Sequence, residues 1–183
     1  MDVVETAIKD IKVFTPAVFE DARGYFTETY NQAKFDAHAP DLVFVQDNES
    51  LSRAKYTVRG LHYQAPPFAQ DKLVRVLRGA VFDVVVDIRA DSSTYGQWVG
   101  HELTADNRKQ LLAPAGFLHG FMTLEPNTIV AYKVTNLYHG PSDGAVFWAS
   151  DSLGIDWPTG PDKAILSDKD KAAPKFEDFK SPF

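Results

Sequence analysis

Two short stretches of the chain indicate its fold: Arg59-Gly60-Leu61-His62-Tyr63-Gln64 and Pro114-Ala115-Gly116-Phe117-Leu118-His119-Gly120. Each places one histidine near a glycine, in a segment whose composition is otherwise typical of a β-strand. A metal site needs three or more protein ligands, and the first stretch has Gln64 where a His-x-His pair would have its second histidine. We therefore expect the two histidines to act in acid–base chemistry, and we expect no metal or other cofactor.

The length and composition of the chain predict one folded domain. Its 183 residues are 44% hydrophobic and 13% aromatic, which is enough to bury a substantial core. We expect a single domain over residues 1–183, with a short helical or looped tail from Pro158 onward. Eleven glycines and eleven prolines, spread along the chain, suit many short strands and turns better than long helices.

Charge and residue types exclude several classes of function. The net charge of −6 comes with no basic block, so no nucleic-acid partner is expected. The absence of cysteine excludes disulfides, thiolate metal sites and a cysteine nucleophile. No signal-peptide pattern is visible, and even the apolar run Ala80–Ile88 is interrupted by Asp83 and Asp87, so we expect a soluble, cytoplasmic protein without membrane contact. No Walker loop, Gly-x-Gly-x-x-Gly or Gly-x-Ser-x-Gly motif is present, which leaves nicotinamide chemistry and serine hydrolysis without support.

Alternation of apolar and polar residues predicts a series of short strands. They are expected at Tyr25–Tyr30, Val43–Gln46, Lys72–Leu77, Val81–Arg89, Trp98–Leu103, Thr128–Tyr138 and Ala145–Trp148. One short helix is predicted at Asn31–Ala39, where an asparagine cap precedes helix formers, and one turn of helix at Ser167–Ala172. Many evenly spaced strands with only a few short helices predict an all-β fold, an antiparallel sandwich or jelly-roll barrel.

His62 is the leading candidate for a general base, because Arg59 lies close to it in the sequence and a second histidine is present. A base of this kind usually has a carboxylate that orients its other ring nitrogen. The residues alone leave four candidates for that carboxylate: Asp83, Asp87, Asp168 and Asp170. Tyr132 is a candidate proton donor, and the candidate cations for phosphate groups are Arg23, Arg59, Lys72 and Lys169.

The two histidine-containing stretches resemble those of the cupin superfamily of small barrels. Blocks along nearly the whole chain further resemble the dTDP-4-dehydrorhamnose 3,5-epimerase family, in the family's own order. These blocks are Phe19–Glu28, Phe44–Asn48, Arg59–Gln64, Lys72–Arg75, Phe82–Arg89, Pro114–Phe121 and Tyr132–Asn136. The resemblance implies a cupin-like jelly roll that forms a homodimer, contains no metal, and epimerises dTDP-4-dehydro-6-deoxy-D-glucose at C3 and C5 to give dTDP-4-dehydro-L-rhamnose.

The same resemblance implies a role for each matching residue. His62 matches the base that abstracts the proton, and Asp170 matches its orienting partner. Tyr132 matches the acid that returns a proton from the opposite face, and Lys72 matches the cation beside the C4 carbonyl. Contacts to the nucleotide or the sugar are implied for Arg23, Glu28, Gln46, Asn48, Arg59, His119, Tyr138, Asp143 and Lys169.

Some of these assignments depend on local features of this chain. Tyr138 matches the residue that stacks on the thymine ring, whereas Asp143 stands where the family usually has glutamate, in a loop of different length. An insertion near Gly160-Pro161 precedes Lys169 and Asp170. Arg59 falls on the opposite strand parity from His62, so both side chains reach one cavity only if the strand has a bulge, which a glycine at position 60 can supply.

Other functions stay open at this point. An epimerase that acts only at C3 or only at C5 of a related dTDP-4-keto sugar, as in antibiotic-sugar biosynthesis, would share nearly all these residues. A non-catalytic nucleotide-sugar-binding jelly roll would need no acid–base set such as His62, Asp170 and Tyr132. A metal-dependent cupin oxygenase that used His62 and His119 is disfavoured by Gln64. Whether Asp170 or Asp83 orients His62 is also open.

Overall fold

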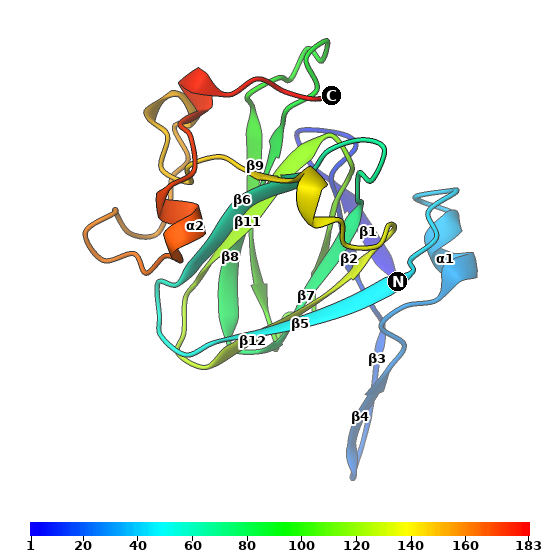
Figure 1. Cartoon of the computed structure of the whole chain (residues 1–183). Coiled ribbons are helices and arrows are strands. Elements are labelled where there is room, and N and C mark those ends of the chain that lie inside the picture. Colours follow the sequence, from blue (N-terminus) through cyan, green and yellow to red (C-terminus); the bar gives the residue numbers. More distant parts are fainter.

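Two antiparallel sheets face each other in the computed structural model, which describes residues 1–183 (Figure 1). The larger sheet has the order β1 (Asp2–Glu5), β2 (Lys12–Thr15), β10 (Gln110–Ala113), β7 (Lys72–Arg78), β12 (Thr128–Val134) and β5 (Gln46–Ser52). The smaller sheet has the order β13 (Asp143–Ala145), β6 (Val58–Gln64), β11 (Phe117–Thr123), β8 (Ala80–Asp87) and β9 (Trp98–Thr104). The predicted all-β jelly-roll fold is confirmed.

The space between the sheets is filled by apolar side chains from the inner face of each sheet. Val74 of β7 and Leu111 of β10 meet Val81 and Val85 of β8 there, and all four are almost completely buried. Inward and outward residues alternate along each strand, so polar residues that lie on the same inner faces enter the barrel as well. This alternation brings the candidate side chains of both sheets into one interior.

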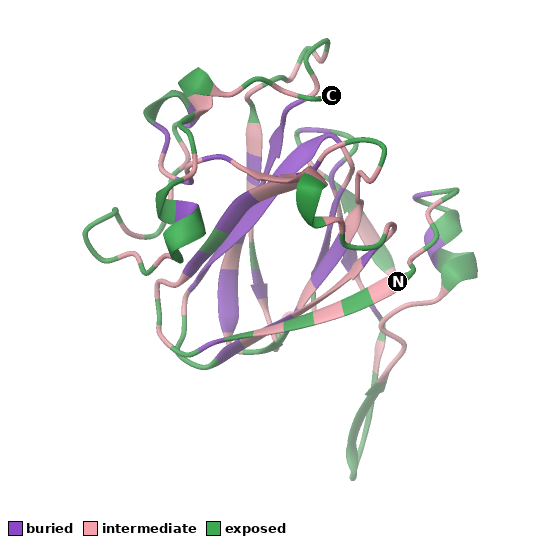
Figure 2. Cartoon of the chain, viewed as in Figure 1, coloured by how far each residue is buried: buried purple, intermediate pink, exposed green.

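A second apolar cluster covers the outer face of the five-stranded sheet. Val84 and Val86 of β8 pack there against Trp148 and against aromatic residues of the C-terminal tail. The 3₁₀ turn η2 (Asp151–Leu153) precedes the tail, which contains the short helix α2 (Asp168–Lys171) and the 3₁₀ turn η3 (Phe176–Asp178). In Figure 2 the buried residues are accordingly concentrated on β6, β8 and β11, because these strands are covered on both faces.

A short helix and a hairpin belong to neither of the two sheets. Helix α1 (Gln32–Asp36) begins at the cap Asn31, whose side chain accepts the N–H of Lys34, and it is shorter than the predicted helix. Phe35 of α1 stacks on Phe14 of β2 at a ring distance of 4.5 Å. The hairpin of β3 (Val18–Asp21) and β4 (Gly24–Thr27) projects away from the barrel (Figure 1).

Four predicted strands differ from the observed ones. Strand β4 ends at Thr27, so the predicted strand Tyr25–Tyr30 is wrong for its last three residues. Strand β12 ends at Val134, where it pairs with Gln46 and Lys72, so the predicted continuation to Tyr138 is wrong. Strand β5 begins at Gln46, opposite the last residue of β12, so the predicted strand Val43–Gln46 is wrong except at its last residue. Of residues 43–45, only Val45 bonds to β12, through its backbone N–H. Strand β13 covers Asp143–Ala145, so the predicted strand Ala145–Trp148 is wrong except at residue 145. The 3₁₀ turn η1 (Gly140–Ser142) precedes β13, and residues 146–148 follow it outside any strand.

Candidate active site

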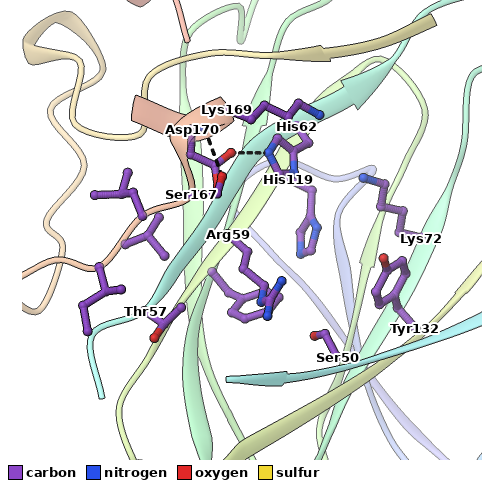
Figure 3. A pocket seen from close by; sticks show the side chains of 14 residues that line it. Ser50, Thr57, Arg59, His62, Lys72, His119, Tyr132, Ser167, Lys169 and Asp170 are labelled. Atoms are coloured by element: carbon purple, nitrogen blue, oxygen red, sulfur yellow. Dashed lines mark hydrogen bonds and ion pairs between the residues drawn. The ribbon is translucent and has the colours of Figure 1, made fainter. Parts of the chain in front are cut away.

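A cavity of about 380 Å³ opens between the two sheets (Figure 3). Seven of the predicted site residues line it: Arg59, His62, Lys72, His119, Tyr132, Lys169 and Asp170. A neighbouring cavity of about 190 Å³ shares four of these residues and adds Gln46, Asn48, Tyr138 and Asp143. We call the first the inner cavity and the second the Tyr138 cavity. Together they collect eleven of the thirteen predicted residues into one continuous cleft.

A bulge in β6 places Arg59 and His62 on the same side of the strand. His62 pairs with His119 and Arg59 pairs with Phe121, so three steps along β6 match two steps along β11. The extra residue reverses the strand parity, as predicted for a glycine at position 60. Gly60 has a φ of +132°, and a Cβ there would lie 2.5 Å from the Cα of Gly120. The two backbones therefore approach closely only because both positions are glycine.

The imidazole of His62 is held by the C-terminal tail. Its Nε2 lies 2.5 Å from Oδ1 of Asp170, while the hydroxyl of Ser167 donates to Oδ2 of the same carboxylate at 2.8 Å. Burial alone would raise the pKa of Asp170, but the hydrogen bond and the charge of His62, together with Ser167, lower this pKa below its usual value. An ionised carboxylate can hold the ring and stabilise the imidazolium that forms when His62 takes a proton.

The second histidine has a carboxylate partner of its own. Nε2 of His119 lies 3.0 Å from both oxygens of Asp83, which is completely buried. The geometry therefore places Asp170 against His62 and Asp83 against His119. The remaining candidate on β8, Asp87, is held outside the cavity by Arg89 and by the hydroxyls of Ser92 and Thr94, at 2.6 Å each. Asp168, the last candidate, is exposed on α2.

Lys72 and Tyr132 enter the cavity from the six-stranded sheet, opposite His62 (Figure 3). Burial lowers the pKa of Lys72 to about 8, although Asp143 and Asp83 partly oppose this shift. Burial raises the pKa of the Tyr132 phenol, and the nearby Arg59 partly opposes that shift. Near neutral pH the cavity therefore holds an ammonium group and a protonated phenol on the wall that faces the imidazole.

The Tyr138 cavity is bordered by a chain of polar contacts. The side-chain amide of Gln46 donates to Asn48 at 2.8 Å, and its oxygen accepts the N–H of Tyr138 at 3.1 Å. The Tyr138 hydroxyl donates to Asp143 at 3.3 Å, and the same carboxylate forms an ion pair with Lys169. The ring of Tyr138 is 64% exposed, so it offers a flat apolar face at the surface of the cleft.

Gln64 has a structural position in this fold. Its side-chain amide donates to the carbonyl groups of Phe68 and Leu137, and its oxygen accepts the N–H of His139 at 2.8 Å. The side chain is thus committed to joining two loops beside the cleft. No group of three or more histidine, aspartate or glutamate side chains is arranged to hold a metal ion.

Two predicted binding residues lie outside the cleft. Arg23 is at the tip of the β3–β4 hairpin, where its 90% exposed side chain pairs with Asp21. Glu28 follows β4 and pairs with Lys34 at 2.8 Å. Neither residue lines the inner cavity or the Tyr138 cavity.

Several lining residues were not anticipated from the sequence. Ser50, Thr57, Phe121, Ile165 and Leu166 also border the inner cavity. Ser167 carried a readable signal, because a serine three residues before an acidic residue is a helix-capping pattern, and it caps α2 as that pattern requires. The others lie on strands or loops where no local pattern distinguishes a lining residue from a core residue.

The chain belongs to the dTDP-4-dehydrorhamnose 3,5-epimerase family, whose family model matches residues 5–178. A dTDP-4-dehydrorhamnose 3,5-epimerase of Sinorhizobium fredii is 49% identical over 170 residues, which are 93% of this chain and 87% of the relative. The dTDP-6-deoxy-D-glucose-3,5-epimerase of Legionella pneumophila, solved in complex with dTDP-4-keto-L-rhamnose, has a TM-score of 0.93 at 41% identity, and the match covers 98% of this chain and 94% of that chain.

Similarity extends to an epimerase of narrower specificity. A 3'-monoepimerase from Streptomyces bikiniensis, solved in complex with dTDP-quinovose, has a TM-score of 0.87 at 29% identity, and the match covers 93% of this chain and 86% of that chain. The backbone alone therefore does not distinguish double from single inversion. None of the helices of the present chain is long and apolar enough to cross a bilayer.

Proposed function

We propose that the protein epimerises dTDP-4-dehydro-6-deoxy-D-glucose at C3 and C5 and so forms dTDP-4-dehydro-L-rhamnose. The observation that carries this proposal is the division of one cavity between a base and an acid. His62 lies on β6 of one sheet, Tyr132 lies on β12 of the other, and Lys72 lies beside Tyr132. Membership of the family and the likeness to epimerases of dTDP sugars support the same function.

The chemistry follows from the acidity of protons next to a ketone. His62 takes the proton from C3 or C5, the C–H electron pair becomes part of an enolate, and the negative charge develops on the C4 oxygen. The Lys72 ammonium stabilises that oxygen as the charge develops. Tyr132 then donates its phenolic proton to the opposite face of the carbon, which inverts the centre. Before the second step the phenolate regains a proton from solvent, and the His62 imidazolium releases its proton to solvent. Both carbons lie next to one carbonyl, so one base serves both steps, and neither step needs an electron donor or acceptor.

The Tyr138 cavity suits the nucleotide part of the substrate. Lys169 lines both cavities and supplies positive charge where they meet, which a diphosphate requires, and Arg59 adds a second cation in the inner cavity. The exposed ring of Tyr138 offers a stacking surface for the thymine base. This placement points the hexose into the inner cavity, towards His62.

Proton NMR in D2O with the 4-keto sugar nucleotide tests the proposed function directly. We expect solvent deuterium to enter C3 and C5, with signals of the inverted sugar appearing at the same time. Deuterium at only one carbon would show a single-centre epimerase. No exchange at either carbon, with nucleotide binding retained, would show a binding protein without this activity.

We further propose that the protein acts as a homodimer, in which each hairpin reaches the cleft of the other copy. The hairpin exposes Phe19, Tyr25 and Phe26, each at least 60% accessible, on a two-stranded ribbon away from the barrel. Such a ribbon has little stability alone, and exposed aromatic residues of this kind mark an interaction surface. A second copy would cover these rings and would bring the predicted contacts Arg23 and Glu28 to a cleft that they do not reach within one chain.

A cytoplasmic location stays a prediction from the sequence, which cell fractionation can test.

A further inference from the structure

Ser50 is the one side chain of the inner cavity whose buried polar atom has no partner. Its Oγ is shielded from solvent and makes no hydrogen bond, whereas Arg108, the other residue with such an atom, does not line this cavity. In Figure 3 the Ser50 hydroxyl lies below Tyr132 and points towards the interior of the cavity. A buried hydroxyl without a partner is unfavourable, so the position is explained most simply if a ligand completes it.

The neighbouring polar side chains each have a hydrogen-bond partner within the protein. On the inner face of β5, Gln46 donates to Asn48, and Ser52 accepts a hydrogen bond from Nε of Arg59 at 3.1 Å. Thr57, on the other side of the cavity, donates its hydroxyl to the carbonyl of Ala54 at 2.9 Å. Ser50 thus lies in a row of polar residues on one strand and is the only member of that row left free.

The position of Ser50 indicates which part of a substrate it meets. It lines the inner cavity but not the Tyr138 cavity. The same cavity is lined by the apolar Val58, Phe121 and Ile165 and by Arg59, whose guanidinium bonds to Ser52 of the same strand. If the nucleotide occupies the Tyr138 cavity, C1 of the hexose faces the nucleotide and C3, C4 and C5 reach this end. The C4 oxygen faces Lys72 in the proposed mechanism, and C5 carries a methyl group that forms no hydrogen bond. The C2 hydroxyl and the ring oxygen are next to C1 and lie nearer the nucleotide, so the hydroxyl that reaches this end is the one on C3.

We propose that Ser50 binds the C3 hydroxyl of the 4-keto hexose and so determines whether inversion occurs at C3 as well as at C5. This inference rests on the proposed function. Ser50 lies on β5, the strand next to β12, and it pairs with Val130, two residues from Tyr132. A hydrogen bond from this side holds the C3 hydroxyl near the wall of the acid, which leaves the C3 hydrogen towards His62 on the opposite wall. The same bond contributes nothing at C5, because the methyl group there has no acceptor or donor.

The test is site-resolved deuterium exchange in the full-length Ser50→Ala variant. Loss of one neutral hydrogen bond should slow exchange at C3 on the order of tenfold relative to exchange at C5. Ser93→Ala removes a hydroxyl from an exposed loop and serves as the matched control with both rates unchanged. The melting temperature and the dTDP affinity of Ser50→Ala should equal or exceed those of the wild type, because no protein hydrogen bond is lost.

Three results would overturn the proposal for Ser50. They are an equal decrease at both carbons, no decrease at either carbon, or a fall in stability that accompanies the loss of activity. If the alanine variant does not fold, Ser50→Cys carries the same comparison, because a thiol has similar shape but is a weak hydrogen-bond donor. A failure of the proposed function itself is recognised separately, since the wild-type enzyme would then show no exchange at C3 before any variant is made.

Discussion

At the scale of single residues, the cleft separates the removal of a proton from its return. His62, oriented by Asp170, lies on one sheet, and Tyr132 lies on the other. The residues alone left four possible carboxylate partners for His62, because partners distant in sequence meet only in the folded chain. Asp170 is 108 positions from His62, and the residue pattern of neither segment predicts that the two side chains meet. The resemblance to the family, rather than any local pattern, indicated the pair.

The first prediction distinguishes the roles of these two side chains. His62→Ala should lower the rate by at least ~10²–10⁴, because it removes a positioned base. Tyr132→Phe keeps the ring but removes the phenolic proton, so the enolate still forms and regains a proton on its original face. That variant should exchange solvent deuterium into the substrate while it inverts poorly, as followed by NMR in D2O. Equal loss of exchange and inversion in Tyr132→Phe would contradict the division of roles, and normal inversion would make this tyrosine structural.

The second prediction concerns the pH dependence that Lys72 should impose. Its pKa of about 8 means that the ammonium is present below this pH and is lost above it. The quotient kcat/KM should therefore fall as the pH rises through about 8, because the neutral amine no longer stabilises the enolate. The raised pKa of Tyr132 keeps the phenol protonated over the same range. Lys72→Arg remains charged and should move the alkaline decline to higher pH. An unchanged decline in that variant would assign it to another group.

At the scale of elements, the sequence predicted the type of most strands and both helices, but it predicted less well where they end. Thr128–Tyr138 alternates beyond Val134, yet β12 stops where its neighbours β5 and β7 stop pairing. Strand ends are set by partners, and partners do not appear in a local pattern. The bulge in β6 is one irregularity that the sequence did predict. Arg59 and His62 have opposite strand parity, so both enter one cavity only if the strand contains one extra residue, and Gly60 lies between them.

The third prediction tests the close approach of β6 and β11. A Cβ at Gly120 would lie 2.8 Å from the carbonyl oxygen of Arg59, and backbone atoms cannot move aside cheaply. Gly120→Ala should therefore reduce the free energy of unfolding by roughly 1–3 kcal/mol, measured by urea denaturation. It should also lower activity, because β6 carries both Arg59 and His62. In the control Gly160→Ala the new methyl group meets only the carboxylate of Asp162. If Gly120→Ala is as stable as this control, the approach is looser than the structure indicates.

At the scale of the whole molecule, the tail and the hairpin extend the barrel in different ways. The tail packs Phe176, Phe179 and Phe183 on the outer face of the smaller sheet and delivers Asp170 to His62. We therefore propose that residues 1–183 unfold as one domain, tail included. The hairpin contacts the barrel through Tyr25, whose ring lies 4.4 Å from the guanidinium of Arg108, while Phe19 and Phe26 stay exposed. Nothing in its sequence alone indicated that Arg23 and Glu28 would lie outside the cleft of their own chain.

The fourth prediction concerns dependence on metal ions. Gln64 is occupied by three hydrogen bonds to neighbouring loops, so it is not free to join His62 and His119 as a ligand. Protein dialysed against EDTA should keep its full epimerase turnover, measured with the 4-keto sugar nucleotide in metal-free buffer. Addition of Mg²⁺, Mn²⁺ or Zn²⁺ should not raise the rate. Loss of turnover that a divalent ion restores would refute the expectation of a reaction without metal.

The fifth prediction tests whether each cleft is completed by a second copy of the chain. Arg23→Ala and His62→Ala should each be poorly active alone, since one lacks the hairpin cation and the other lacks the base. In a mixed dimer, the cleft with an intact His62 receives the intact Arg23 of its partner. Co-refolding equal amounts should therefore restore about a quarter of wild-type activity, because half of the dimers are mixed and each has one complete cleft. The control is Arg23→Ala refolded with a chain that carries both Arg23→Ala and His62→Ala, because no dimer in that mixture has a complete cleft. If Arg23 acted within its own chain, the first mixture would recover nothing, even where sedimentation shows a dimer.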